Sequence, residues 1–259
     1  MKLSVVLATY NEEKNLGPCL DLIKDIADEI VVVDGRSSDR TVEIAKKYGA
    51  KVIVADNPPI FHLNKQKAID LALGDWILQL DADERVTPEL KEEIRSSINN
   101  PLSANGYWIP RKNWFLGRFL TKGGQYPDYT LRLFRKGKGK LPCQSVHEQA
   151  VVEGEVGYLK NPLIHMADTS FRRYLRRWDR YTDLMASELK QESAQKGAVS
   201  KFYESLKFLF IKPTWWFLLT YLRHKGFMDS WQGFVFSFFS ALRFPVGYLK
   251  YLKIYFFKK

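Results

Sequence analysis

The chain has 259 residues, of which 46% are hydrophobic and 27% charged, and this composition excludes a disordered chain. Two cysteines are too few for a disulfide framework and indicate a reducing compartment. The net charge of +11 is uneven, because residues 1–159 hold 22 Lys+Arg and 22 Asp+Glu, whereas residues 160–259 hold 18 and 7. The sequence thus predicts a neutral front and a basic back, which leaves nucleic acid and anionic membranes open as partners.

Apolar, β-branched runs alternate with helical patterns over the first hundred residues. The expected strands are Leu3–Ala8, Ile30–Val33, Lys51–Val54 and Trp76–Leu80. Helices are expected from Leu16 to Ile23, Asp39 to Tyr48, Asn64 to Leu73, and from Pro88 onward after the capping residue Thr87. This alternation predicts an α/β domain over residues 1–168, with a mostly parallel sheet covered by helices on both faces. The apolar run at the start is too short for a signal peptide, so we expect a protein that is not exported.

Polar clusters follow three of these strands, at Thr9–Glu12, Asp34–Asp39 and Asp81–Glu84. Because ligands bind outside the carboxyl ends of parallel strands, we expect the clusters to line one crevice. Carboxylates as close in sequence as Asp81 and Asp83 repel each other unless a cation lies beside them, and Mg²⁺ commonly bridges carboxylates to phosphates. Neither a G-x-G-x-x-G nor a G-x-x-x-x-G-K-[ST] motif is present. The sequence therefore predicts a metal–diphosphate site.

The combination of Thr9–Glu12, Val33–Thr41 and Leu80–Glu84 resembles the family 2 glycosyltransferases of the GT-A fold. Later stretches resemble the branch that contains bacterial lipopolysaccharide-core glucosyltransferases: Gly123–Asp128, Arg132–Arg135 and Val146–Glu148. This resemblance runs over most of the chain. It implies a Rossmann-like GT-A domain and an inverting glycosyltransferase that depends on a divalent metal, Mg²⁺ or Mn²⁺.

On the matching positions, the resemblance also implies roles for single residues. Donor-binding residues would be Thr9, Asn11, Glu12, Asp34, Asp39, Lys65 and Asp81. Asn11, Glu12 and Asp34 would hold the base and ribose of a nucleoside-diphosphate sugar, and Lys65 would meet a phosphate. Asp81 would lie near the ribose, and Asp83 would bind the metal that bridges the diphosphate.

Inverting transfer needs a general base that takes the proton of the acceptor hydroxyl. Candidates are Asp128, His147 and Glu148. By its position after Arg132–Arg135, Glu148 matches the catalytic carboxylate of related enzymes, and Asp128 is the second candidate. His147 could instead complete the ligands of the metal, with a structural histidine as the commoner alternative. His165 has the same ambiguity and is interpreted as structural.

Residues 169–259 change to a helical, basic and aromatic-rich pattern. Their apolar runs fall short of the roughly 18–20 residues that a transmembrane helix needs. Aromatic-rich helices flanked by lysines instead suit the membrane interface, where anionic lipid attracts them. The alternative is that these helices pack on the catalytic domain or in an oligomer. We expect a cytoplasmic protein attached peripherally to the inner face of the cytoplasmic membrane.

The favoured function is transfer of a hexose, with glucose first, from a UDP-linked donor to a glycolipid or lipopolysaccharide-core acceptor. Transfer to a polyprenyl phosphate is the neighbouring alternative, since it needs the same site and a similar tail. A protein of another class, with a lapsed site and a function in membrane or nucleic-acid binding, is the third hypothesis. No nucleic-acid partner is expected under the first two.

Overall fold

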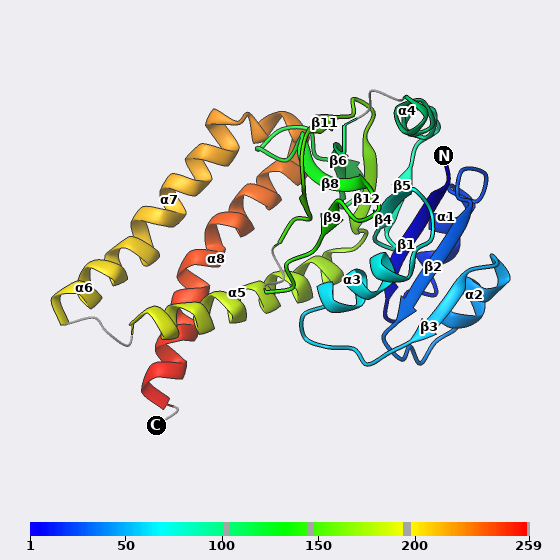
Figure 1. The fold of residues 1–259 in the computed structure, drawn as a ribbon. Helices are drawn as coiled ribbons and strands as arrows, with labels where there is room; N and C mark the ends of the chain where they lie inside the picture. Colours follow the sequence, from blue (N-terminus) through cyan, green and yellow to red (C-terminus); the bar gives the residue numbers. More distant parts are fainter. Residues whose placement is uncertain (101–103, 145–147, 194–197, 258–259) are drawn as a thin grey trace. The chain divides into compact units, whose positions relative to one another are not determined.

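The computed structural model describes residues 1–100, 104–144, 148–193 and 198–257 (Figure 1). The chain forms two compact units. Unit 1 contains residues 1–112 and 128–166, and unit 2 contains residues 113–127 and 167–259.

The first half of the sheet in unit 1 is parallel. Its strands are β1 (Leu3–Thr9), β2 (Glu29–Asp34), β3 (Lys51–Val54) and β4 (Trp76–Leu80), in the order β3-β2-β1-β4. The helices of this unit are α1 (Leu16–Asp21), α2 (Thr41–Lys47), α3 (His62–Leu71) and α4 (Pro88–Asn99). The four predicted strands are confirmed. The cap of α4 is confirmed too, since the Thr87 side chain accepts a hydrogen bond from the backbone N–H of Leu90.

Both faces of β1, β2 and β4 are buried, which explains why these strands are mainly apolar, whereas the edge strand β3 has no buried residue. Val5, Leu7 and Val32 belong to the core on the side of α1 and α4. Their sequence neighbours Val6 and Val31 belong to a second core on the side of α3. Alternate residues of one strand thus enter opposite cores, as the two-residue period of a strand requires. Helices on both faces are confirmed.

The sheet continues beyond β4 through antiparallel strands, which the sequence analysis did not describe. Strand β8 (Asp128–Arg135) pairs with β4, and β6 (Gly106–Phe115) pairs with β8. Further along, β12 (Leu163–Asp168) pairs with β5 (Glu84–Val86). Shorter strands complete this region: β7 (Arg118–Phe119), β9 (Gly139–Lys140), β10 (Val151–Val152) and β11 (Val156–Tyr158). Strand β8 buries the polar residues Thr130 and Arg132, which weaken its apolar pattern.

Unit 2 is mainly helical, as the tail was predicted to be. Its elements are α5 (Phe171–Ser193), α6 (Ala198–Leu206), the π-helical turn η1 (Lys207–Ile211), α7 (Lys212–Phe217), the π-helical turn η2 (Leu218–Arg223), the 3₁₀ turn η3 (Gly226–Asp229) and α8 (Ser230–Phe257). α7 and α8 lie side by side, and α5 also packs on α8 (Figure 1). No helix in the described parts of the chain combines the length and the apolar character that crossing a membrane requires.

Candidate functional site

Residues Asp81–Glu84, called the acidic tip, form a tight turn between β4 and β5 in unit 1. The backbone N–H of Glu84 donates to the carbonyl of Asp81, and the backbone N–H of Asp81 donates to Glu84 Oε2 at 2.9 Å. This reciprocal pair fixes the turn at the carboxyl end of β4. Because β2, β1 and β4 are parallel neighbours, the three predicted polar clusters lie at the same edge of the sheet.

Two cations neutralise Asp81. Lys65 Nζ lies 2.5 Å from Asp81 Oδ1, and Arg132 Nη2 lies 2.6 Å from Asp81 Oδ2. Burial would raise the pKa of Asp81, but Arg132 and Lys65 hold that pKa well below its usual range. Burial lowers the pKa of Lys65, although Asp81 opposes the shift. The carboxylate of Asp81 is therefore ionised and fixed in place.

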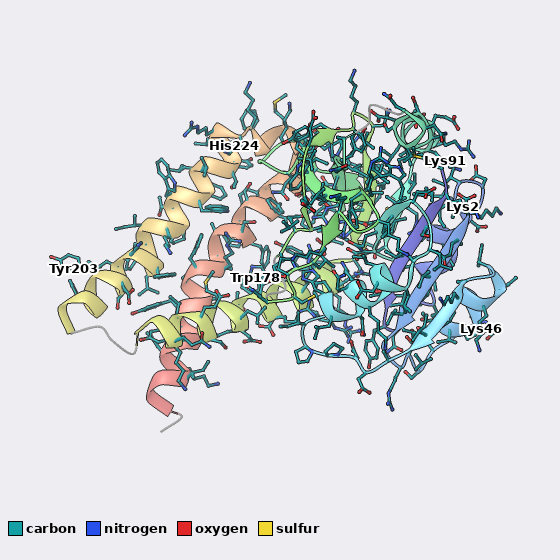
Figure 2. All side chains as sticks on the ribbon, in the orientation of Figure 1. Lys2, Lys46, Lys91, Trp178, Tyr203 and His224 are labelled. Atoms are coloured by element: carbon teal, nitrogen blue, oxygen red, sulfur yellow. The ribbon has the colours of Figure 1, made fainter. Side chains whose placement is uncertain are left out.

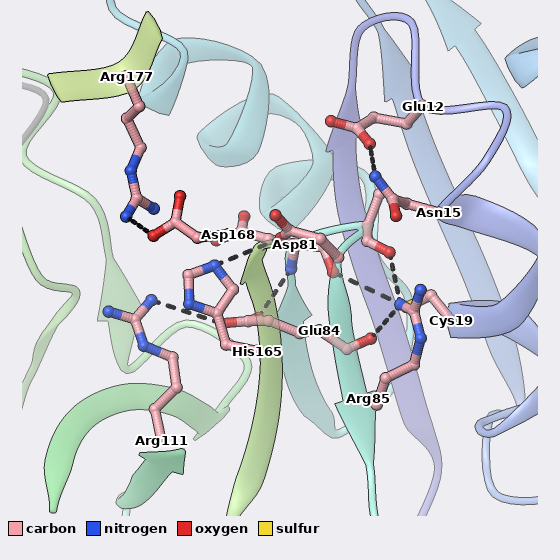
Figure 3. Close-up of polar contacts among 12 residues, drawn as sticks. Glu12, Asn15, Cys19, Asp81, Glu84, Arg85, Arg111, His165, Asp168 and Arg177 are labelled. Atoms are coloured by element: carbon pink, nitrogen blue, oxygen red, sulfur yellow. Dashed lines mark hydrogen bonds and ion pairs between the residues drawn. The ribbon is translucent and has the colours of Figure 1, made fainter. Parts of the chain in front are cut away.

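Glu84 is fully buried and is held by two arginines. Arg132 Nη2 lies 2.9 Å from Glu84 Oε1. Arg111 Nη1 lies 3.7 Å from the same oxygen, and Figure 3 shows Arg111 beside Glu84. Burial raises the pKa of Glu84, while Arg132 opposes that rise. Arg132 also donates to the side-chain oxygen of Gln79, so three side chains share one buried guanidinium.

Replacing Arg132 by methionine is expected to destabilise the fold. Asp81 would keep Lys65, but Glu84 would lose its nearest cation in a fully buried place. Removing one partner of a buried ion pair costs about 3–5 kcal/mol of the free energy of unfolding. For a chain of this size, that corresponds to a fall of roughly 10 °C in the thermal midpoint.

Thermal unfolding of Arg132→Met followed by circular dichroism measures this effect, with Lys46→Met as the matched control. Lys46 is exposed on α2 (Figure 2), so its loss removes the same charge without breaking a buried pair. If the thermal midpoint falls equally in both variants, the buried ion pairs of Arg132 stabilise the fold no more than an exposed lysine does.

Asp83 faces His165. Asp83 Oδ1 lies 3.6 Å from His165 Nε2, and both side chains are largely buried, at 15% and 14% exposure. The antiparallel register of β5 with β12 places His165 opposite Glu84, and the backbone N–H of Met166 donates to the carbonyl of Asp83. From the sequence alone, His165 is interpreted as a structural histidine. Nothing in the sequence pairs positions 83 and 165, since their proximity depends on this strand register.

The Asp83–His165 pair suits a divalent cation in the chemistry of its donors. A carboxylate oxygen is the ligand that Mg²⁺ prefers, and a neutral imidazole nitrogen is a ligand for transition metals such as Mn²⁺. In the described part of the chain, no three His, Cys, Asp or Glu side chains are arranged to hold a metal by themselves. The pair offers one carboxylate and one imidazole ligand, so a divalent cation held there would need further ligands such as water. His147 lies outside the described residues.

The first polar cluster is joined to the second by Asp34 and Ser37. Thr9 Oγ1 donates to Asp34 Oδ2 at 3.0 Å, and Ser37 Oγ donates to the same oxygen at 2.6 Å. Asn11 adopts a left-handed conformation with φ of 55°, and its Oδ1 accepts from the backbone N–H of Ser38 at 2.8 Å. Asp34 is fully buried, so its carboxylate shapes the two loops.

Glu12 and Asp39 continue this network. Asn15 Nδ2 donates to Glu12 Oε2 at 2.7 Å (Figure 3), and the backbone N–H of Glu12 donates to Thr41 Oγ1 at 2.7 Å. Asp39 Oδ1 accepts from the backbone N–H of Thr41 at 3.0 Å, and Asp39 Oδ2 accepts from that of Glu13 at 3.1 Å. Burial would raise the pKa of Asp39, but hydrogen bonds from the Thr41 hydroxyl and from the backbone N–H groups of Thr41 and Glu13 lower it.

The two candidate bases lie in different surroundings of unit 1. Glu148 Oε2 is 3.8 Å from His62 Nδ1, and Glu148 Oε1 accepts from the backbone N–H of Gln144 at 2.7 Å. His62 precedes Lys65 by three residues on α3, so the two lie on one helix face. Asp128 Oδ2 instead accepts two hydrogen bonds from Arg111, at 3.0 and 2.7 Å.

The chain was compared with protein families, with curated proteins and with solved structures. Residues 4–151 match the family model described as Glycosyl transferase family 2. The chain is 28% identical over 260 residues to the lipopolysaccharide core biosynthesis glycosyltransferase LpsC of Rhizobium meliloti, covering 94% of this chain and 92% of that protein.

Two solved structures are also similar. The crystal structure of TarS residues 1–349 from S. aureus has a TM-score of 0.48 and 17% identity, and the match covers 98% of this chain and 89% of that one. The glucosyl-3-phosphoglycerate synthase of Mycobacterium tuberculosis, solved with Mn²⁺, UDP and glucosyl-3-phosphoglycerate, has a TM-score of 0.36 and 21% identity, covering 44% of each chain.

Proposed function

Since the chain belongs to glycosyl transferase family 2 and is a glycosyltransferase, we propose that it moves a hexose from a nucleoside-diphosphate sugar to a lipid-linked glycan. A UDP-sugar is the proposed donor, with glucose as the first choice of sugar. The proposed acceptor is a glycolipid or a lipopolysaccharide core, which is supported by the similarity to LpsC.

The observation that carries this proposal is the acidic tip at the carboxyl end of β4. Asp81 is already neutralised by Lys65 and Arg132, so the carboxylate of Asp83, two residues further along the chain, is the one suited to a metal. Asp83 and His165 would hold Mg²⁺ or Mn²⁺ together. When bound, the metal would supply a Lewis acid that stabilises the departing diphosphate. Lys65 lies at the same tip, where a phosphate oxygen could replace its contact with Asp81.

The remaining donor contacts would come from the loops after β1 and β2. Thr9, Asp34 and Asp39 hold these loops by hydrogen bonds, and we propose that they position the base and ribose site. Asn11 is exposed and Glu12 is half-buried, and these two residues would make the direct contacts. Asp81 would lie near the ribose.

Glu148 is the proposed general base. In the transfer step, the acceptor oxygen forms a bond to the anomeric carbon as the bond from that carbon to the diphosphate breaks. The hydroxyl proton passes to the Glu148 carboxylate, and the bonding pair leaves with the diphosphate. Asp128 suits this role less well, because its Oδ2 already accepts two hydrogen bonds from Arg111 and is held in that ion pair.

A transfer assay tests the proposed acceptor class. The enzyme is incubated with UDP-[¹⁴C]glucose, Mn²⁺ and either a lipopolysaccharide-core acceptor or a polyprenyl phosphate, and the organic and aqueous products are separated. Label in the core, with a mass increase of one hexose, is the expected result. Label in the polyprenyl fraction alone would show that the acceptor is a polyprenyl phosphate. If neither acceptor is labelled, with UDP-glucose or with other labelled nucleotide sugars in its place, the proposed function is contradicted.

A further inference from the structure

One face of the helical segment from α6 to η2 is apolar and exposed. Its successive exposed side chains are one, three or four residues apart: Phe202, Tyr203, Leu206, Phe210, Ile211, Trp215, Leu218 and Leu222. Phe202 and Phe210 are each 63% exposed and Trp215 is 60% exposed. Figure 2 shows Tyr203 projecting from α6 on the side away from α8. At 1.5 Å per residue, this stripe is about 30 Å long.

The exposed stripe continues around the turn into α8. Phe227, Met228, Trp231 and Phe234 are all about half exposed there. The ring of Phe234 lies 6.0 Å from that of Phe217 and 5.7 Å from that of Tyr221, so the two parts adjoin. These twelve exposed residues are called the aromatic face below.

Most of the aromatic face takes no part in the hydrophobic core of unit 2. The opposite side of the same segment already packs on α8, where Phe208 stacks on Tyr248 with ring centroids 5.5 Å apart. Trp216 contacts Phe244 from the same side, with ring centroids 5.8 Å apart. The hydrophobic contact that holds this helix in place is therefore complete without the aromatic face. An exposed apolar surface of this extent marks an interaction site.

Most charges on the segment that carries the aromatic face are positive. Residues 198–234 contain 5 Lys+Arg and 2 Asp+Glu. One of the two acids, Asp229, is 1% exposed and accepts hydrogen bonds from the backbone N–H groups of Thr121 and Lys122, which leaves Glu204. Lys207, Arg223 and Lys225 are exposed on the same segment and its turn.

We propose that the aromatic face binds the surface of an anionic lipid bilayer, with the helical segment lying in the plane of the interface. Phenylalanine, tryptophan and leucine side chains would enter the boundary between headgroups and acyl chains, and the basic residues would contact lipid phosphates. A second copy of the chain fits less well, because two such faces would bring like charges together. The proposal deepens the proposed function, because a lipid-linked acceptor lies in a membrane and the aromatic face would bring the enzyme to it. The observations that support the aromatic face all come from unit 2.

Vesicle sedimentation tests the proposal without any need for turnover. The full chain is mixed with vesicles of phosphatidylethanolamine and phosphatidylglycerol at 3:1, and with vesicles of phosphatidylcholine alone. We expect binding to the first that weakens as salt is added, and weaker binding to the second. The double variant Phe210→Ser/Trp215→Ser should bind the anionic vesicles at least about 10-fold more weakly, because two large apolar side chains are lost.

A matched control removes exposed apolar side chains from unit 1. Leu73 is 75% exposed and Tyr158 is 62% exposed, so Leu73→Ser/Tyr158→Ser should bind like the unchanged protein. Equal binding by the two double variants would overturn the proposal. A dimer in lipid-free solution that Phe210→Ser/Trp215→Ser converts to a monomer would assign the face to a second copy instead.

Donor turnover, measured without lipid, separates this proposal from the proposed function. Phe210 and Trp215 are placed in no catalytic role, so their double variant should release nucleotide at the unchanged rate. Loss of vesicle binding with turnover retained supports the bilayer surface. If the protein binds vesicles but turns over no donor, the proposed membrane-binding surface is supported and the proposed glycosyl transfer is contradicted.

Discussion

Asp83→Ala is expected to abolish glycosyl transfer, with a loss in kcat of roughly 10³-fold or more. Asp83 is the acidic-tip carboxylate that faces His165, whereas Asp81 is already paired with Lys65 and Arg132. Without Asp83 the proposed metal loses its carboxylate ligand, and the charge of the departing diphosphate is left without its Lewis acid. Initial rates at saturating donor and Mn²⁺ measure the effect.

Glu43→Ala is the matched control, because Glu43 is an exposed carboxylate on α2 in the same unit. Its rate should equal that of the unchanged protein. Thermal midpoints of both variants show whether a loss of activity reflects unfolding. A folded Asp83→Ala protein that keeps more than a tenth of the rate would remove Asp83 from the proposed metal site.

Glu148→Gln is expected to stop chemistry while donor binding is retained. A general base typically raises the rate of the chemical step by 10²–10⁴-fold, so kcat should fall by about that factor. The amide of glutamine has nearly the same shape as the carboxylate and can still accept a hydrogen bond from Gln144, but it cannot take the acceptor proton. Calorimetric titration with UDP and Mn²⁺ should give an unchanged Kd.

Asp128→Asn separates the two candidate bases. Because Asp128 pairs with Arg111, its loss should affect the position of that arginine more than proton transfer. If Glu148→Gln keeps its turnover and Asp128→Asn loses it, the base is Asp128. If both variants turn over normally, neither carboxylate takes the proton.

Much of the parallel half of unit 1 could be predicted from local patterns. Strands β1, β2 and β4 are mainly apolar because both of their faces are buried. The capping residue Thr87 and the buried residues Leu90, Ile94 and Ile98 define α4 directly. The family 2 resemblance, the α/β fold class and the helical tail are all confirmed. In each of these cases, the signal lies within one element or one motif.

What the sequence could not predict depends on contacts between distant strands. His165 reaches Asp83 only through the antiparallel register of β5 and β12. Arg132 reaches Asp81 and Glu84 from β8, a strand whose own pattern shows no partner for a buried guanidinium. Histidine and arginine have many structural and functional roles in proteins. Their residue type alone therefore does not identify the contact, which depends on how the strands pair in the sheet.

Nucleotide release from a panel of UDP-, GDP- and dTDP-sugars is the most direct test of a metal–diphosphate site at the acidic tip. Each donor is incubated with Mg²⁺, with Mn²⁺ and with EDTA, in the presence of a lipid extract as acceptor. We predict release from one donor, which EDTA abolishes and added metal restores. Release that is unchanged in EDTA, or no release and no binding of any donor, would contradict the metal–diphosphate site.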